Sequence, residues 1–165
     1  MTHTSTYRVR RVTGTVSTDD IIPARYKHMH TDPKLLAPHL FEAYLPGFVD
    51  TVEPGDAIVS DSVFGIGSSR EQAVSTLLAN GIGLVIAPRF GRILFRNCWN
   101  LALPAIETDT DRLTEGMTIS LDLGRGEIRC EGTVLATFPE PPPFLLEMIS
   151  HGGLLPRVKT RVTGA

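Results

Sequence analysis

The chain has 165 residues, enough to bury one substantial core, and it is most simply a single domain covering residues 1–165. Its composition is ordinary for a globular protein. Its formal net charge is −2, so it lacks the net positive charge that would attract nucleic acid. No apolar run approaches the roughly 20 residues of a membrane helix. Residues 1–7 are too polar for a signal peptide, so we expect a cytoplasmic protein without nucleic-acid or membrane partners.

The first third of the chain is predicted to contain a strand, a long polar loop and a helix. Valine, arginine and threonine partly alternate over residues 7–16, which indicates the strand, and the polar loop covers 17–31. Asp32 followed by Pro33 is typical of a helix start. Pro38 must then lie in the first turns or kink this helix. The apolar face of the helix is predicted to comprise Leu35, Leu36, His39, Leu40 and Ala43.

The middle of the chain alternates between predicted strands and helices. The three strands cover residues 57–59, 83–87 and 105–107, and the two helices cover 71–80 and 90–101. The strand at 83–87 is wholly apolar, which is typical of a strand covered on both faces. Such alternation predicts parallel pairing with right-handed crossovers.

The last third changes character. Three short strands at 116–122, 126–130 and 133–138 are joined by tight turns, and a short helix follows at 144–150. The segment 154–165 is basic, and we expect its last residues to be mobile. The fold class predicted from the whole pattern is α/β, with a mixed sheet that has an antiparallel, barrel-like portion.

One segment carries most of the chemistry, the glycine-rich loop that ends in Ser68, Ser69 and Arg70 just before a predicted helix. Helix starts attract anions, the glycines allow a ligand to approach the backbone, and an arginine fork can grip a carboxylate. The same donors would favour the alkoxide form of a serine. The plainer interpretation is that Ser69 is only a helix cap. Neither a dinucleotide fingerprint nor a P-loop is present.

Three stretches, in order, resemble motifs of the aconitase superfamily, and most closely those of the 3-isopropylmalate dehydratase small-subunit family. Residues 65–73 resemble its Gly-Ser-Ser-Arg-Glu-His-Ala serine loop, with Gln72 in place of the histidine. Residues 17–26 resemble its Asp-Thr-Asp-x-Ile-Ile-Pro-x-Arg-Tyr loop, and residues 82–104 resemble its strand-to-helix segment. The resemblance implies the swivelling β/β/α fold of the aconitase C-terminal type.

The resemblance also implies an activity and a set of site residues. Members of this family are hydro-lyases that isomerise 2-isopropylmalate and 3-isopropylmalate by removing and re-adding water in leucine biosynthesis. By resemblance, Ser68 is the catalytic base as an alkoxide, and Asp19 is an orienting carboxylate beside it. Ser69 and Arg70 would hold a substrate carboxylate, with Gly67 in the same binding loop. Taken alone, the loop containing Asp19 is more often a turn or a helix cap.

The reaction needs a [4Fe–4S] cluster, which this chain is not expected to bind. Cys98 and Cys130 are its only cysteines, so a four-cysteine cluster site cannot be built from it, and no metal site is predicted. The resemblance therefore implies a cluster-bearing large subunit in a heterodimer or heterotetramer. The chain would be active, on a small hydroxy-dicarboxylate substrate, only with that partner.

The loop at residues 27–31 is predicted to contact the group that differs between substrates of this family. Lys27, His28 and His30 make it polar and cationic, which would suit an anionic side group better than an isopropyl group. The alternatives are therefore a homoaconitase-type or other malate-derivative dehydratase. A different class again is a non-catalytic anion-binding module, in which Ser68 would be dispensable.

Overall fold

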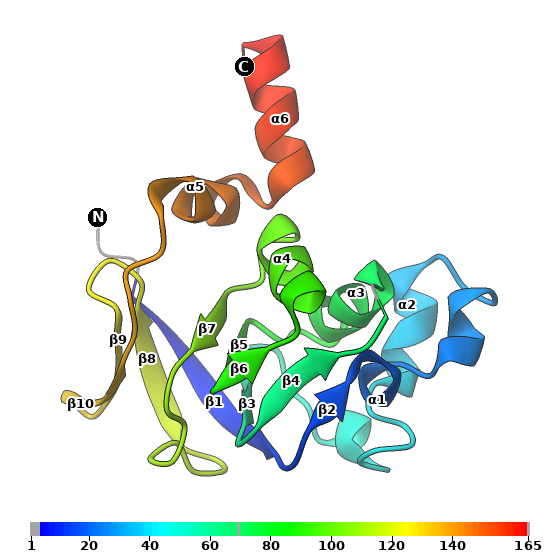
Figure 1. Ribbon diagram of the computed structural model, residues 1–165, viewed down its shortest axis with the longest axis horizontal. Helices are drawn as coiled ribbons and strands as arrows, with labels where there is room; N and C mark the ends of the chain where they lie inside the picture. The colour runs from blue at the N-terminus through cyan, green and yellow to red at the C-terminus, as the bar shows by residue number, and fades with distance from the viewer. Residues whose placement is uncertain (1–3, 69, 165) are drawn as a thin grey trace.

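The computed structural model describes residues 4–68 and 70–164 and contains two sheets (Figure 1). The larger sheet has seven strands and curls into a half-barrel. In spatial order its strands are β10 (Thr133–Thr137), β9 (Glu127–Cys130), β8 (Thr118–Asp122), β1 (Thr4–Val12), β3 (Asp56–Ser60), β5 (Leu84–Ala87) and β7 (Ala105–Glu107). The smaller sheet is parallel and consists of β2 (Val16–Ser17), β4 (Val63–Ile66) and β6 (Arg89–Phe90).

Strand β1 joins the two halves of the large sheet. It pairs in parallel with β3, and β3, β5 and β7 continue this parallel half. On its other edge β1 pairs antiparallel with β8, which begins the meander through β9 to β10. Every residue of β3 and β5 is buried, because both faces of the parallel half are covered. The predicted parallel core and antiparallel portion are both confirmed.

Short helices frame the smaller sheet, and two longer ones lie beside it (Figure 1). The longer pair, α3 (Glu71–Ala79) and α4 (Arg92–Asn100), pack against each other. The short ones are α1 (Thr18–Ile21), η1 (Ala24–Lys27), α2 (Pro33–Leu36), η2 (Ala37–His39) and η3 (Phe48–Asp50). The last two, α5 (Pro143–His151) and α6 (Leu154–Thr163), lie beyond the end of the sheet, and α6 projects away from the body. No described helix has the length and apolarity needed to span a membrane.

Two predictions for the first third of the chain are wrong. The strand predicted over 7–16 is interrupted, because Gly14 turns the chain at a positive φ of 76° between β1 and β2. The helix after Asp32 is only one turn long and continues as the 3₁₀ helix η2, which contains Pro38. Leu35 is exposed, so it does not belong to a buried helical face. The cap itself is confirmed, since the Asp32 carboxylate accepts from the Lys34 N–H at 2.9 Å.

Two further segments differ from expectation. Residues 89–90 form strand β6, so the helix predicted over 90–101 begins only at Arg92. Residues 154–163, predicted as a basic tail with mobile last residues, form helix α6 instead. Residue 165 lies outside the described residues.

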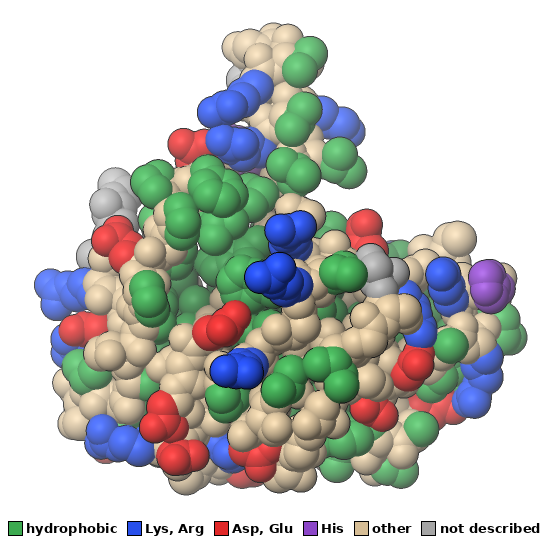
Figure 2. Space-filling view, viewed as in Figure 1, with side chains coloured by type: hydrophobic (Ala, Val, Ile, Leu, Met, Phe, Trp, Pro, Cys, Tyr) green, Lys and Arg blue, Asp and Glu red, His purple; other side chains and the backbone are tan. Residues whose placement is uncertain are grey.

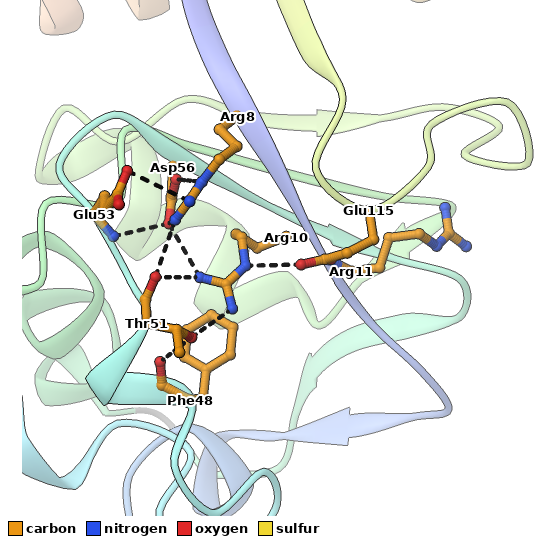
Figure 3. Close-up of polar contacts among 8 residues, drawn as sticks. All are labelled: Arg8, Arg10, Arg11, Phe48, Thr51, Glu53, Asp56 and Glu115. Atoms are coloured by element: carbon orange, nitrogen blue, oxygen red, sulfur yellow. Dashed lines mark hydrogen bonds and ion pairs between the residues drawn. The ribbon is translucent and has the colours of Figure 1, made fainter.

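A buried carboxylate anchors the junction between β1 and β3 (Figure 3). Asp56 is 1% exposed, and its two oxygens accept from the Arg8 Nε and Nη2 at 2.8 Å each and from the Arg10 Nη1 at 3.3 Å. The Glu53 N–H donates to the same carboxylate at 2.9 Å. Burial alone would raise the pKa of Asp56, but these hydrogen bonds outweigh it and hold the pKa below its ordinary value.

Candidate active site

The serine loop connects the end of β4 to the start of α3, and close packing against α4 shapes it. Gly65 has a positive φ of 84°, and a Cβ there would collide with Leu94 on α4. A Cβ on Gly91, just before α4, would collide in turn with the carbonyl oxygen of Gly65. Both glycines are therefore required by close approach. Gly67 has a φ of 104° and lies exposed at the tip of the loop.

Arg70 is the centre of the polar network in this corner. Its side chain is 6% exposed, and its Nε and Nη2 donate to the Ser68 Oγ at 3.1 and 2.9 Å. The Nη1 donates to the Ile22 carbonyl at 3.3 Å, and the Nη2 also forms an ion pair with Asp19. The guanidinium thus holds together two segments that are distant in sequence, and it places two donors on one hydroxyl that faces solvent.

Helix α1 presents Asp19 to this arginine through a capping box. The Asp20 carboxylate accepts from the Ser17 N–H at 2.7 Å, while the Asp20 N–H donates to the Ser17 Oγ at 3.1 Å. Asp20 is therefore engaged in the cap, and Asp19 is left with its side chain 60% exposed and directed at Arg70.

Thr18 is a residue of this corner that sequence reasoning missed. It is buried, and its Oγ1 donates to the Ser68 carbonyl at 3.0 Å, which ties the α1 segment to the serine loop. A hydroxyl inside a short polar motif gives no sign of such a distant partner.

The structure brings together four of the predicted site residues, Ser68, Asp19, Arg70 and Gly67. Arg70 is the N-cap of α3, and it makes no side-chain cap bond. Ser69, which was predicted to bind a substrate carboxylate, lies outside the described residues.

The predicted specificity loop is placed at the end of η1. Lys27 and His28 are exposed, and the His30 ring stacks on Tyr26 with the ring centroids 6.4 Å apart. Within residues 4–68 and 70–164, no hydrogen bond or ion pair joins this loop to Ser68 or Arg70. The loop is thus available to a ligand, but it is not part of the arginine-centred network.

The described residues do not fit an iron–sulfur cluster. They contain no group of three histidine, cysteine or acidic side chains that could hold a metal ion. Cys98 is buried in α4, where burial raises the pKa of its thiol to about 12, so it stays protonated near neutral pH. Cys130 lies apart from it in β9.

Comparisons with known proteins agree with this fold. Residues 15–111 match the model of the aconitase C-terminal domain family. The 3-isopropylmalate dehydratase small subunit of Syntrophus aciditrophicus is 41% identical, over 96% of this chain and 98% of that protein. Small subunit 2 of the same enzyme from Archaeoglobus fulgidus is 40% identical, over 87% of this chain and 88% of that protein.

Solved structures give the same result. The crystal structure of 3-isopropylmalate dehydratase (LeuD) from Methanocaldococcus jannaschii has a TM-score of 0.88 and 36% identity, covering 97% of this chain and 96% of that one. Aconitase X from Thermococcus kodakaraensis, at 14% identity and a TM-score of 0.50, covers 73% of this chain and 85% of that one and shares the fold alone. The swivelling fold of the aconitase C-terminal type is confirmed, and the chain belongs to the family of 3-isopropylmalate dehydratase small subunits.

Proposed function

We propose that this chain supplies the base and the carboxylate clamp of a hydro-lyase that interconverts 2-isopropylmalate and 3-isopropylmalate. The observation that carries the proposal is the position of Arg70, which contacts both Ser68 and Asp19 in one exposed corner. The names of the relatives support the substrate, since they are 3-isopropylmalate dehydratase small subunits.

Ser68 is the group to which we assign proton abstraction. A neutral serine is too weak a base to remove a C–H proton alpha to a carboxylate, so its alkoxide must be stabilised. Two guanidinium N–H groups already point at its oxygen, at 2.9 and 3.1 Å. Fixed donors of this kind act where charge develops and need little reorganisation during the reaction. The proton would pass from the substrate carbon to the Ser68 Oγ.

The contact with Asp19 suggests how the Arg70 guanidinium, the proposed carboxylate clamp, is kept in position before substrate binds. The Asp19 carboxylate contacts the same Arg70 nitrogen that a substrate carboxylate would use, and its side chain is more than half exposed. We propose that the substrate carboxylate replaces Asp19 at the guanidinium and that Gly67 and Ser69 line the same site. Asp19 would then remain beside the reacting centre as the orienting carboxylate.

Replacing Arg70 with lysine tests the clamp. We expect KM for 3-isopropylmalate to rise by about one to two decades, because an ammonium cannot hold Ser68, the Ile22 carbonyl and the substrate carboxylate together as the guanidinium does, and a charge-assisted bond is worth about 1.5–3 kcal/mol. Arg25→Lys is the matched control, since Arg25 pairs with Glu42 at 2.7 Å outside this corner. Steady-state kinetics of the assembled enzyme measure both. An unchanged KM in the Arg70 variant would contradict the clamp.

The departing hydroxyl needs a Lewis acid, and we propose that a [4Fe–4S] cluster on the large subunit provides it. The cysteines of this chain support that division, because Cys98 is a buried, protonated thiol on α4 and Cys130 lies on a different element, β9. We expect the purified chain to show neither iron–sulfur absorption nor turnover, and both to appear after reconstitution with the large subunit. Cluster absorbance that stays with this chain when the two are separated would contradict the proposal.

The loop at 27–31 is proposed to contact the part of the substrate that differs between the substrates of this family. If the exposed cationic groups meet an anionic side group, replacing Lys27, His28 and His30 with leucine, threonine and valine is expected to shift preference toward 3-isopropylmalate, over a homocitrate-type substrate, by about one to two decades in relative kcat/KM. With isopropylmalate as the natural substrate, these groups would face solvent and Met29 would supply the apolar wall. Lys34→Leu, an exposed change on α2, is the control. A preference ratio that the triple substitution leaves unchanged removes the loop from substrate selection.

A further inference from the structure

Helix α6 carries an apolar stripe that nothing in the described chain covers. Leu155, Val158 and Val162 are spaced i, i+3 and i+7, which places them on one helical face. Their exposed fractions are 71%, 44% and 80%. Figure 1 shows why, since the helix projects from the body with its C-terminal end free. An apolar helical face is normally buried against another surface.

A second apolar surface lies at the foot of the same helix. Two adjoining hollows of about 290 and 390 Å³ share Phe95, Trp99 and Leu145 as lining residues, and Phe144 forms an exposed wall of the second. Figure 2 shows this region as a hollow in which hydrophobic side chains gather below α6. We call these two hollows together the α4–α5 groove.

The charges on α6 and those beside the first of the two hollows are of opposite sign. Helix α6 has the sequence LLPRVKTRVT, with three cationic and no acidic residues. Of these, Arg157 is already paired with Glu147 at 2.7 Å, while Lys159 and Arg161 are exposed on either side of the apolar stripe. The first hollow of the α4–α5 groove has Glu107 and Glu140 among its lining residues, and the second has Arg96. The stripe therefore matches the groove in polarity, and the cations of α6 match the two carboxylates of the first hollow in charge.

The foot of α6 meets the end of α4 away from the catalytic corner, and the groove runs along α4 from Phe95 onward. The start of α4 packs on the serine loop through Gly91, whereas its end contacts Gly153 just before α6, where a Cβ would meet the Asn100 carbonyl at 2.6 Å. The nine residues of α4 separate the two places by about 13 Å at 1.5 Å per residue.

We propose that two copies of this chain associate by exchanging α6, the apolar stripe of each copy lying in the α4–α5 groove of the other. Each copy carries both the apolar stripe and the α4–α5 groove. A two-fold axis therefore forms two identical stripe–groove contacts and closes the assembly as a dimer. Lys159 and Arg161 would face the carboxylates of Glu107 and Glu140 across the contact. This association is independent of the proposed chemistry.

Sedimentation velocity of the purified chain, from about 1 to about 100 µM, tests the association. We expect a reversible dimer whose Kd rises at least about tenfold in Val162→Glu, because a charge would be placed in an apolar contact. Thr163→Glu is the matched control, since it adds the same charge to the adjacent exposed position about 100° around the helix. The far-ultraviolet circular dichroism of both variants establishes that they fold.

A charge exchange tests the register of the contact. Arg161→Glu and Glu140→Lys are each expected to weaken the dimer, and the double variant is expected to recover most of the loss. The proposal is overturned if the chain is monomeric over the whole range, or if Val162→Glu leaves the dimer unchanged. It is overturned as well if Val162→Glu weakens only binding to the large subunit, because the stripe then belongs to that interface.

Discussion

Replacing Ser68 with alanine is expected to lower the turnover of the assembled enzyme by about 10²–10⁴-fold, the range typical of losing a general base. Substrate affinity and subunit assembly should change little, because the Ser68 side chain is exposed and bonded only to Arg70 within the described residues. The measurement is kcat and KM for 3-isopropylmalate, with the large subunit present in excess.

Ser75→Ala is the matched control for this experiment. Ser75 lies on α3, just beyond the serine loop, and among the residues that the structure describes its Oγ donates only to the Glu71 carbonyl, at 3.2 Å. Its loss should leave kcat within a factor of about two, as expected for a surface change of a few tenths of a kcal/mol. Near-normal turnover in the Ser68 variant would place the base elsewhere. Such a result would favour the non-catalytic, anion-binding alternative.

Replacing Asp56 with asparagine is expected to destabilise the fold by about 2–4 kcal/mol. Breaking a buried ion pair commonly costs about 3–5 kcal/mol, and the lower range applies here because the Arg8 side chain is about a third exposed. Urea unfolding measured at neutral pH would report the loss as a lower midpoint with an unchanged slope. An unaltered midpoint would show that Asp56 does not anchor β1 to β3.

The same site predicts how stability depends on pH. Because the pKa of Asp56 is lowered in the folded state, its contribution is fully present above the ordinary carboxyl value of about 4 and is lost as the pH falls through the folded pKa. The stability difference between the wild type and Asp56→Asn should therefore shrink below about pH 4. Glu53→Gln is the control, since Glu53 is an exposed partner of Arg8 at 3.4 Å and should contribute under about 1 kcal/mol.

Local signals in the sequence predicted much of the fold. The apolar run at 83–87 became the wholly buried strand β5, and Asp32 and Gly81 ended up at helix boundaries as their residue types indicate. The serine loop was predicted for the same reason, since glycines, hydroxyls and an arginine before a helix have a local physical meaning. The Asp19–Arg70 contact was not predicted: the resemblance placed Asp19 near the serine loop without naming its partner, and no local rule links segments so far apart.

The segments that were missed depend on tertiary contacts or on weak local patterns. Strand β6 is two residues long and exists only through its pairing with β4. Helix α6 contains Pro156 and several cationic residues, which favoured a tail, yet proline is tolerated in a first helical turn. Its i, i+3, i+7 apolar spacing was the signal that could have identified it.

The central place of β1 has a consequence for how the chain folds during synthesis. This strand is made before the rest of its sheet, but its antiparallel neighbour β8 does not begin until Thr118, so one edge of β1 has no native neighbour while the residues between them are translated. At roughly 5–20 residues per second, that edge is open for several seconds on the ribosome. Unpaired strand edges invite contacts between nascent chains, so slowing translation after β3 should increase aggregation more than slowing it after β8.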